Sequence, residues 1–208
     1  MSTSTPSDDA PWNSFRFAVV DLEGNGQQPP DLVELSVIPI DLGTPGIVRS
    51  WLVKPSQEIT RRVTRIHGIR NADVEMAPTF DTISAEILES LAGRCLVAHN
   101  AAVDWGVLQR KLPSLKPPAV IDTLRLTRAL YPDRISYSLD SLIVDLGLQK
   151  HLEGVESRRH RATYDATAAL HLLLYVIAKA PGGTLSFRQL IALSALPGVE
   201  TSRQQSLF

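Results

Sequence analysis

Three short acidic segments carry the residues whose types and spacing could do chemistry. The first contains Asp21 and Glu23, the second contains Asp104, and the third contains His160 and Asp165. Carboxylates supply the oxygen ligands that Mg²⁺ and Mn²⁺ prefer. A neutral imidazole can accept a proton near neutral pH. The set predicts two Mg²⁺ or Mn²⁺ ions and a histidine base, a combination that favours phosphodiester cleavage by two metals roughly 3.5–4 Å apart.

The first segment is predicted to lie at the end of a buried strand. Residues 17–20 are apolar, and Asp21 follows them directly. Side chains two residues apart lie on the same face of an extended chain. Asp21 and Glu23 can therefore converge on shared metal ions.

The other two segments are predicted to open helices. Asn100 follows a second apolar run and is expected to be the N-cap of a helix with Asp104 about one turn in. Apolar residues recur at helical spacing over 162–177, which places Asp165 in the first turn of a later helix and His160 just before it.

The remaining elements define the fold class. Strands are predicted at 17–21, 32–40, 47–53, 94–98 and 119–121. Helices are predicted at 78–93, 104–112, 123–130, 138–146 and 162–179, with a short one at 186–196. Turn residues between the first three strands indicate an antiparallel meander. The later alternation of strands and helices predicts an α/β fold in which helices flank a mixed five-stranded sheet.

Taken in order, the motifs resemble those of the DnaQ-like 3′–5′ exonucleases of the DEDDh type. That family has Asp-x-Glu, then His-Asn-x-x-x-Asp, then His-x-x-x-x-Asp, and all three patterns occur here. The resemblance continues in the intervening segments and covers roughly residues 15–178. It implies a ribonuclease H-like fold and a metal-dependent 3′–5′ exonuclease.

The resemblance also implies roles for individual residues. It makes His160 the general base. The metal ligands that it implies are Asp21, Glu23, Asp104 and Asp165. The residues that it places near the terminal nucleotide are Leu22, Gly24, Asn25, Ile66, His67, Asn100 and Val103.

Two departures from the family pattern fall near that nucleotide. Gly24-Asn25-Gly26 replaces the common Thr-Thr-Gly, and Val103 replaces a residue that is often aromatic. Both changes leave the expected metal ligands intact. They bear on the preference for sugar and base.

The implied substrate is a single-stranded or frayed DNA 3′ end, in proofreading or repair. One alternative is an RNA-directed exonuclease of the same superfamily. Another is a non-catalytic module that binds a sliding clamp or a DNA polymerase. Retention of every expected catalytic residue favours an enzyme over the module.

The composition is that of a globular protein. The 208 residues predict one domain at 14–180, a disordered segment at 1–13 and a C-terminal extension at 181–208. Cys95 is the only cysteine, so no internal disulfide can form. The first residues do not resemble a signal peptide, and no apolar run approaches membrane-spanning length. We therefore expect a cytoplasmic protein that does not bind membranes.

The net charge of −1 is low for a protein that binds nucleic acid without sequence preference. Local basic clusters occur at Arg61, Arg62 and Arg65, and again over 158–161. Either cluster could be a solvated surface. A weakly charged exonuclease is expected to dissociate often, so a tether would help it.

The C-terminal residues offer such a tether. Gln204, Ser206, Leu207 and Phe208 are similar to the short peptide by which bacterial replication and repair proteins bind the sliding clamp, although Gln205 replaces the usual Leu. Two adjacent apolar anchors and a polar Gln suit insertion into a groove. The sequence thus predicts a sliding-clamp partner; the alternative is a frayed terminus.

Overall fold

A computed structural model of the chain describes residues 6–155 and 159–199. The strands are β1 (Phe17–Gly24), β2 (Leu32–Asp41), β3 (Thr44–Pro45), β4 (Arg49–Leu52), β5 (Cys95–Ala98) and β6 (Val120–Asp122). The α-helices are α1 (Arg61–His67), α2 (Phe80–Leu91), α3 (Ala102–Lys111), α4 (Thr123–Leu130), α5 (Leu139–Asp145), α6 (Ala162–Ala178) and α7 (Phe187–Ser194). Short 3-10 helices are η1 (Trp12–Ser14), η2 (Asn71–Val74) and η3 (Gln149–His151).

One mixed sheet organises the molecule. Its order is β3-β2-β1-β5-β6, and β4 also pairs with β2. β1 and β4 are antiparallel to β2, which confirms the predicted meander, whereas β5 runs parallel to β1 and to β6. The predicted count of five strands was wrong. The sheet has six because the chain turns back after β2 and forms the two-residue β3 before β4.

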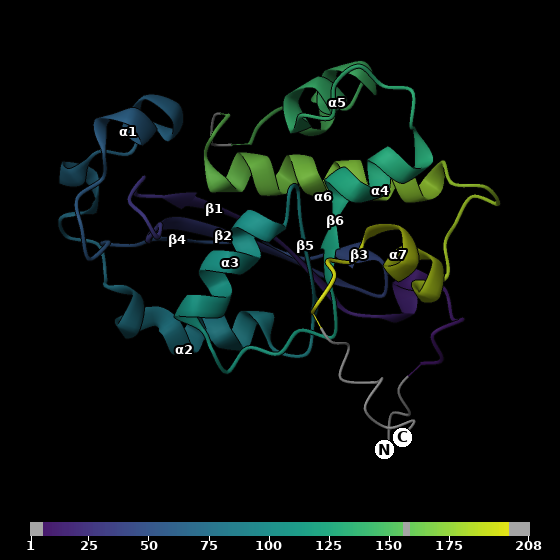
Figure 1. Ribbon diagram of the computed structural model, residues 1–208, viewed down its shortest axis with the longest axis horizontal. Coiled ribbons are helices and arrows are strands. Elements are labelled where there is room, and N and C mark those ends of the chain that lie inside the picture. Colours follow the sequence, from purple (N-terminus) through teal and green to yellow (C-terminus); the bar gives the residue numbers. More distant parts are fainter. Residues whose placement is uncertain (1–5, 156–158, 200–208) are drawn as a thin grey trace.

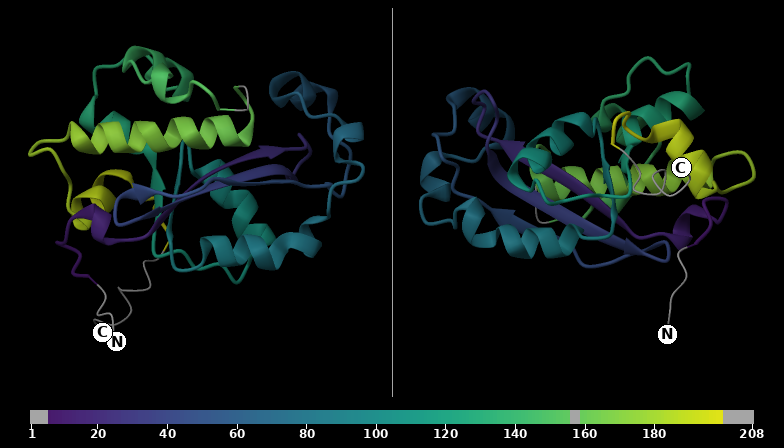
Figure 2. Two further views of the ribbon diagram at one scale, coloured as in Figure 1. Left: turned by 180° about the vertical axis from the view of Figure 1, so that it is seen from behind. Right: turned by 60° about the horizontal axis from the view of Figure 1, so that its bottom comes forward.

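Helices cover both faces of the sheet (Figures 1 and 2). α6 packs on β1 and β2, with α4 and α5 against it, while α2 and α3 lie on the opposite face. The side chains of β1 point alternately toward the helices on the two faces of the sheet. Phe17 and Val19 join the core beneath α6, whereas Ala18 and Val20 join the core beside α2 and α3. This alternation directs the next odd-numbered side chains of β1 toward α6.

The N-terminal segment is ordered from residue 6, where the described part of the chain begins. The prediction of disorder over 1–13 was therefore wrong for residues 6–13. Trp12 is buried, and its N–H donates to the carbonyl of Leu185. Its ring lies 5.6 Å from that of Phe17. Phe187 of α7 stacks on Phe15 and belongs to the same core as α6. Residues 6–16 and 185–194 are therefore packed together on the domain.

One helix was missed from the sequence, and one local prediction was wrong. No sequence pattern indicated α1, a seven-residue helix that ends at left-handed Gly68. Asn100 is not a helix N-cap: it is exposed with φ 63°, and Ala101 precedes α3 instead. Within the two described ranges, no helix has the length and apolar character needed to cross a bilayer.

Candidate active site

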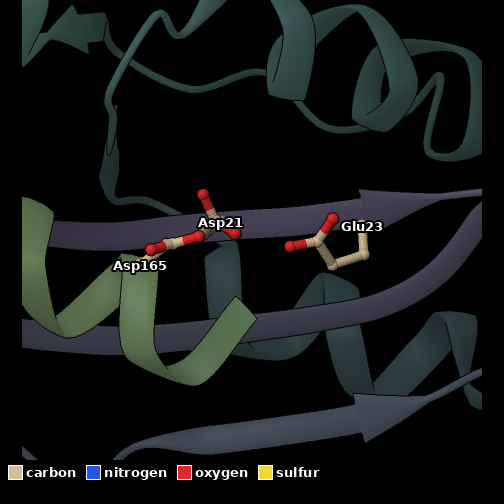
Figure 3. Close-up of side chains that lie close together, drawn as sticks. All are labelled: Asp21, Glu23 and Asp165. Carbon is tan, nitrogen blue, oxygen red and sulfur yellow. The ribbon is translucent and has the colours of Figure 1, made fainter. Parts of the chain in front are cut away.

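Asp21 and Glu23 of β1 meet Asp165 of α6 in one acidic cluster. The three residues offer ligand atoms that all lie within 4.8 Å of one another (Figure 3). The alternation of β1 explains this, because Asp21 and Glu23 share the parity of Phe17 and Val19 and so face α6. Asp165 lies in the first turn of that helix, as predicted. The cluster has the size and oxygen donors that suit a divalent cation.

Asp104 reaches the same centre from the other side of β1. It lies in the first turn of α3, is only 6% exposed, and accepts a hydrogen bond from the N–H of Leu22 at 3.2 Å. α3 follows β5, the parallel neighbour of β1, so its first turn opens at the carboxyl end of the sheet. The structure thus brings the four predicted carboxylates into one neighbourhood.

Burial and mutual repulsion make these carboxylates hard to ionise together. Burial, reinforced by nearby Asp165 and Glu34, raises the pKa of Glu23 to about 8. Burial raises the pKa of Asp104 to about 7 and that of Asp165 to about 6. The pKa of Asp21 is raised well above its usual range by burial and by repulsion from Asp104. A site with this much uncompensated negative charge fits bound cations, which favour the ionised carboxylates.

His160 lies at the edge of the cluster, directly before α6. Its φ is 57° and it is exposed. Burial dominates the raised pKa of Asp165, and the charge and backbone hydrogen bond of His160 partly oppose that rise. His160 borders a hollow of about 730 Å³ that Asp21 and Asp165 also line. An imidazole in this position is next to the carboxylates that could bind a metal ion and is exposed to solvent.

A partly buried ion pair fixes the segment that carries His160. Glu34 of β2 is 4% exposed, and its carboxylate accepts from Nε of Arg161 at 2.9 Å. It also accepts from Nη2 of Arg161 at 2.5 Å and from the N–H of Ala162 at 2.9 Å. Glu34 thus replaces an N-cap side chain at α6, because Arg161 itself provides none.

A second contact ties the same two elements together. Ser36 Oγ and Thr163 Oγ1 lie 2.8 Å apart. The strand register places Ser36 opposite Asp21 and Glu34 opposite Glu23, so all four side chains face α6. Neither Glu34 nor Arg161 was predicted as a site residue. The only sequence signal for them was their position in family-like segments.

His99 has a structural role at the end of β5. Its ring nitrogens lie 2.9 Å from Thr123 Oγ1 and 2.9 Å from the carbonyl of Tyr137. Burial lowers the pKa of His99, so the neutral ring donates from Nε2 to the carbonyl. The residue ties the end of β5 to the wall of the large hollow.

The residues expected near a nucleotide occupy different surroundings. Gly24, Ile66 and His67 line a second hollow, of about 200 Å³, together with Glu23. Asn100 lines the large hollow. These four remain candidates for substrate contact, as does Val103, which is 56% exposed.

The structure corrects the expectation for Asn25 and places Leu22 elsewhere. The Asn25 side chain is fully buried, where it accepts from the N–H groups of Gln27 and Asp31 and holds the turn after β1. A nucleotide could not reach it without opening that turn. Leu22 packs toward the core beside α2 and α3, and only its backbone faces Asp104.

Comparison with known proteins places the chain among exonucleases. The family RNase_T, described as an exonuclease family, matches residues 18–173. The chain is 33% identical over 174 residues to a DNA polymerase III of the PolC type from Thermotoga maritima, covering 81% of this chain and 12% of that protein. It is 28% identical over 174 residues to the 3′–5′ exonuclease DinG of Bacillus subtilis, covering 80% and 18%.

A solved structure agrees with the fold. Exonuclease X in complex with 5′ overhanging duplex DNA superposes with a TM-score of 0.68 at 26% identity. The match covers 84% of this chain and 97% of that one. The chain spans less than a fifth of the PolC-type and DinG proteins, whose further regions have no counterpart in these matches.

Proposed function

Because the chain belongs to the exonuclease family, we propose that it is a metal-dependent 3′–5′ exonuclease that removes nucleoside monophosphates from DNA 3′ ends. The observation that carries the proposal is the convergence of Asp21, Glu23 and Asp165 within 4.8 Å, beside His160. The named relatives include a 3′–5′ exonuclease, and the solved relative is in complex with 5′ overhanging duplex DNA. The first supports the direction of cleavage, and the second supports DNA as the substrate.

In this proposal the four carboxylates hold two Mg²⁺ or Mn²⁺ ions. Asp21 lies among Glu23, Asp104 and Asp165, so it would hold metal together with them. When bound, such ions neutralise the phosphate and stabilise the leaving oxygen. Glu23, Asp104 and Asp165 complete the set, either directly or through water.

His160 would act as the base. Its exposed imidazole is free to accept the proton of the attacking water and to release it to solvent afterwards. Glu34 and Arg161 hold the backbone next to His160 in place, so the ring is presented from a fixed support. The 3′-terminal nucleoside would lie near Gly24, Ile66 and His67.

Labelled oligonucleotides test the proposal directly. A 5′-labelled single-stranded DNA should shorten one nucleotide at a time in Mg²⁺ or Mn²⁺, whereas a 3′-labelled strand should release labelled mononucleotide at once. A matched RNA should be a poorer substrate. Preferential cleavage of the RNA would assign the enzyme to the RNA-directed branch, and no cleavage of either would favour the non-catalytic binding module.

We also propose that residues 204–208, which lie outside the described residues, bind a bacterial sliding clamp. The support is the resemblance of Gln204, Ser206, Leu207 and Phe208 to clamp-binding peptides. Tethering would make each return to the 3′ end effectively intramolecular. Titration of the clamp with the protein and with a Leu207→Ala, Phe208→Ala variant tests this. Equal affinities, or none, would remove the tail from the account. A DNA polymerase is a further proposed partner, supported by the polymerase relatives.

A further inference from the structure

α1 exposes three arginines whose positions do not stabilise the helix. Arg61, Arg62 and Arg65 are all exposed on this helix. Arg61 and Arg62 occupy its first turn, where free N–H groups disfavour positive charge. Arg61 and Arg65 are four residues apart, a spacing at which like charges destabilise a helix. The first turn has no acidic residue and no side-chain cap to offset this.

Three other arginines near the site are neutralised by carboxylates. Arg161 pairs with Glu34, Arg159 with Asp140, and Arg134 with Asp145. By contrast, none of the three α1 arginines has an ion-pair partner among the residues that the structure describes. Arg128, on the wall of the large hollow, also has no ion-pair partner in the described part of the chain, but it lies over the ring of Tyr137. α1 differs because it gathers three such arginines on one short helix.

The α1 arginines are next to the cluster. Arg62 borders the hollow of about 200 Å³ that Glu23, Gly24 and His67 also line. Figure 1 shows α1 at the same end of the molecule as the N-terminal end of α6, and Figure 2 shows the same arrangement from behind. α1 is also held in place, since the N–H of Thr60 donates to the carbonyl of Asn25. A strand that leaves the cluster through this hollow would pass within reach of α1.

We propose that Arg61, Arg62 and Arg65 bind the phosphate backbone of the DNA substrate beside the 3′ end. This inference rests on the proposed function for the identity of the polyanion. Residues that violate local stability rules without compensation are expected at functional sites. Phosphate contacts would supply the missing negative charge, and they explain how a protein of net charge −1 holds a polyanion.

The test compares three variants of the full chain by fluorescence anisotropy, with Ca²⁺ as the divalent ion and two labelled probes. One probe is a single-stranded oligonucleotide, and the other is the same strand paired so that its 3′ end is recessed. In the first variant all three arginines become Gln. In the second they become Lys, which keeps the charge. The third is a charge-matched control in which the exposed residues Arg49, Lys116 and Lys150 become Gln.

The Gln variant should bind at least one probe more weakly. The slope of log affinity against log salt should fall by roughly 2–3, about one unit for each phosphate that the variant can no longer neutralise. The Lys variant and the control should keep most of the wild-type slope. The Tm of the Gln variant should equal or exceed that of the wild type, because repulsion is removed.

Wild-type affinity and slope for both probes in the Gln variant would overturn the inference. So would an equal loss of affinity in the Gln and Lys variants with a lowered Tm, because that result would assign the arginines to packing. Exonuclease activity is measured separately on the wild type. Its absence would defeat the proposed function while leaving a measured dependence of DNA binding on α1 intact.

Discussion

The two flanks of the acidic cluster are built on opposite principles. The α6 flank, defined as residues 159–163 with Glu34, is internally neutralised: Arg161 is paired, and the N–H of Ala162 is capped by a carboxylate. The α1 flank, defined as residues 61–67, leaves its arginines exposed and without ion-pair partners in the described part of the chain. A fixed catalytic segment gains from internal partners. A surface that must meet a polyanion gains from having none.

Removing the metal should have the largest expected effect, because it should abolish cleavage whatever the state of either flank. Excess chelator should reduce cleavage to background, because the carboxylates then repel the phosphate. Mg²⁺ or Mn²⁺ should restore it, as measured on a 5′-labelled strand. Ca²⁺ should raise the Tm without comparable turnover, since its looser coordination misplaces the reacting oxygens. Full activity in chelator would refute a metal mechanism.

His160→Ala should slow the chemical step while leaving metal binding and the rest of the α6 flank intact. The kcat should fall by roughly 10²–10⁴-fold, the usual contribution of a general base. Mn²⁺ binding, measured by calorimetry, should persist because the carboxylates remain. The control is His151→Ala, which removes another exposed histidine. A wild-type kcat in the His160 variant would show that another group takes the proton.

Glu34→Gln should loosen the α6 flank without removing any proposed ligand. We expect kcat to fall by roughly 10–100-fold, the range for residues that orient a metal site. The KM for DNA should change little, because Glu34 is buried. Ser36→Ala, which removes the hydroxyl partner of Thr163, should have a smaller effect. A change in KM with an unchanged kcat would assign Glu34 to substrate binding instead.

The smallest expected effect is a dependence of thermal stability on pH, which arises from the acidic cluster between the two flanks. The pKa values of Glu23, Asp104 and Asp165 are raised above about 4, so the metal-free folded protein binds more protons than the unfolded chain between pH 4 and 8. Its Tm should therefore fall as the pH rises through this window. Saturating Mg²⁺ should flatten the decline, as measured by thermal denaturation. A Tm that rises with pH would contradict the raised pKa values.

The sequence predicted much of the site because local patterns determine it. Asp21 and Glu23 share a face by strand geometry alone, and the apolar spacing after Ala162 placed Asp165 in a first turn. The Glu34–Arg161 pair depends instead on the register between β1 and β2, which no local pattern reports. The same holds for Trp12, whose burial comes from contact with a helix far along the chain.

The local pattern also gave a wrong N-cap where a hydrogen bond to a distant residue competed with it. Asn100 looked like a helix N-cap, but its N–H donates to Asp122 Oδ1, which also accepts from the N–H of Leu124 and caps α4. The shared carboxylate draws Asn100 into a left-handed turn before α3. α1 escaped prediction because it is short and its arginines interrupt any apolar stripe.

The alternation along β1 limits which changes in length the gene can tolerate. A single inserted or deleted codon between Val19 and Asp21 would turn Asp21 and Glu23 toward the α2 and α3 layer. The reading frame would survive, yet the acidic cluster would be lost. A two-codon insertion would keep the side chains facing α6 while moving them about 7 Å along the strand. Over this short stretch, even an in-frame change in length would therefore remove or displace the acidic cluster.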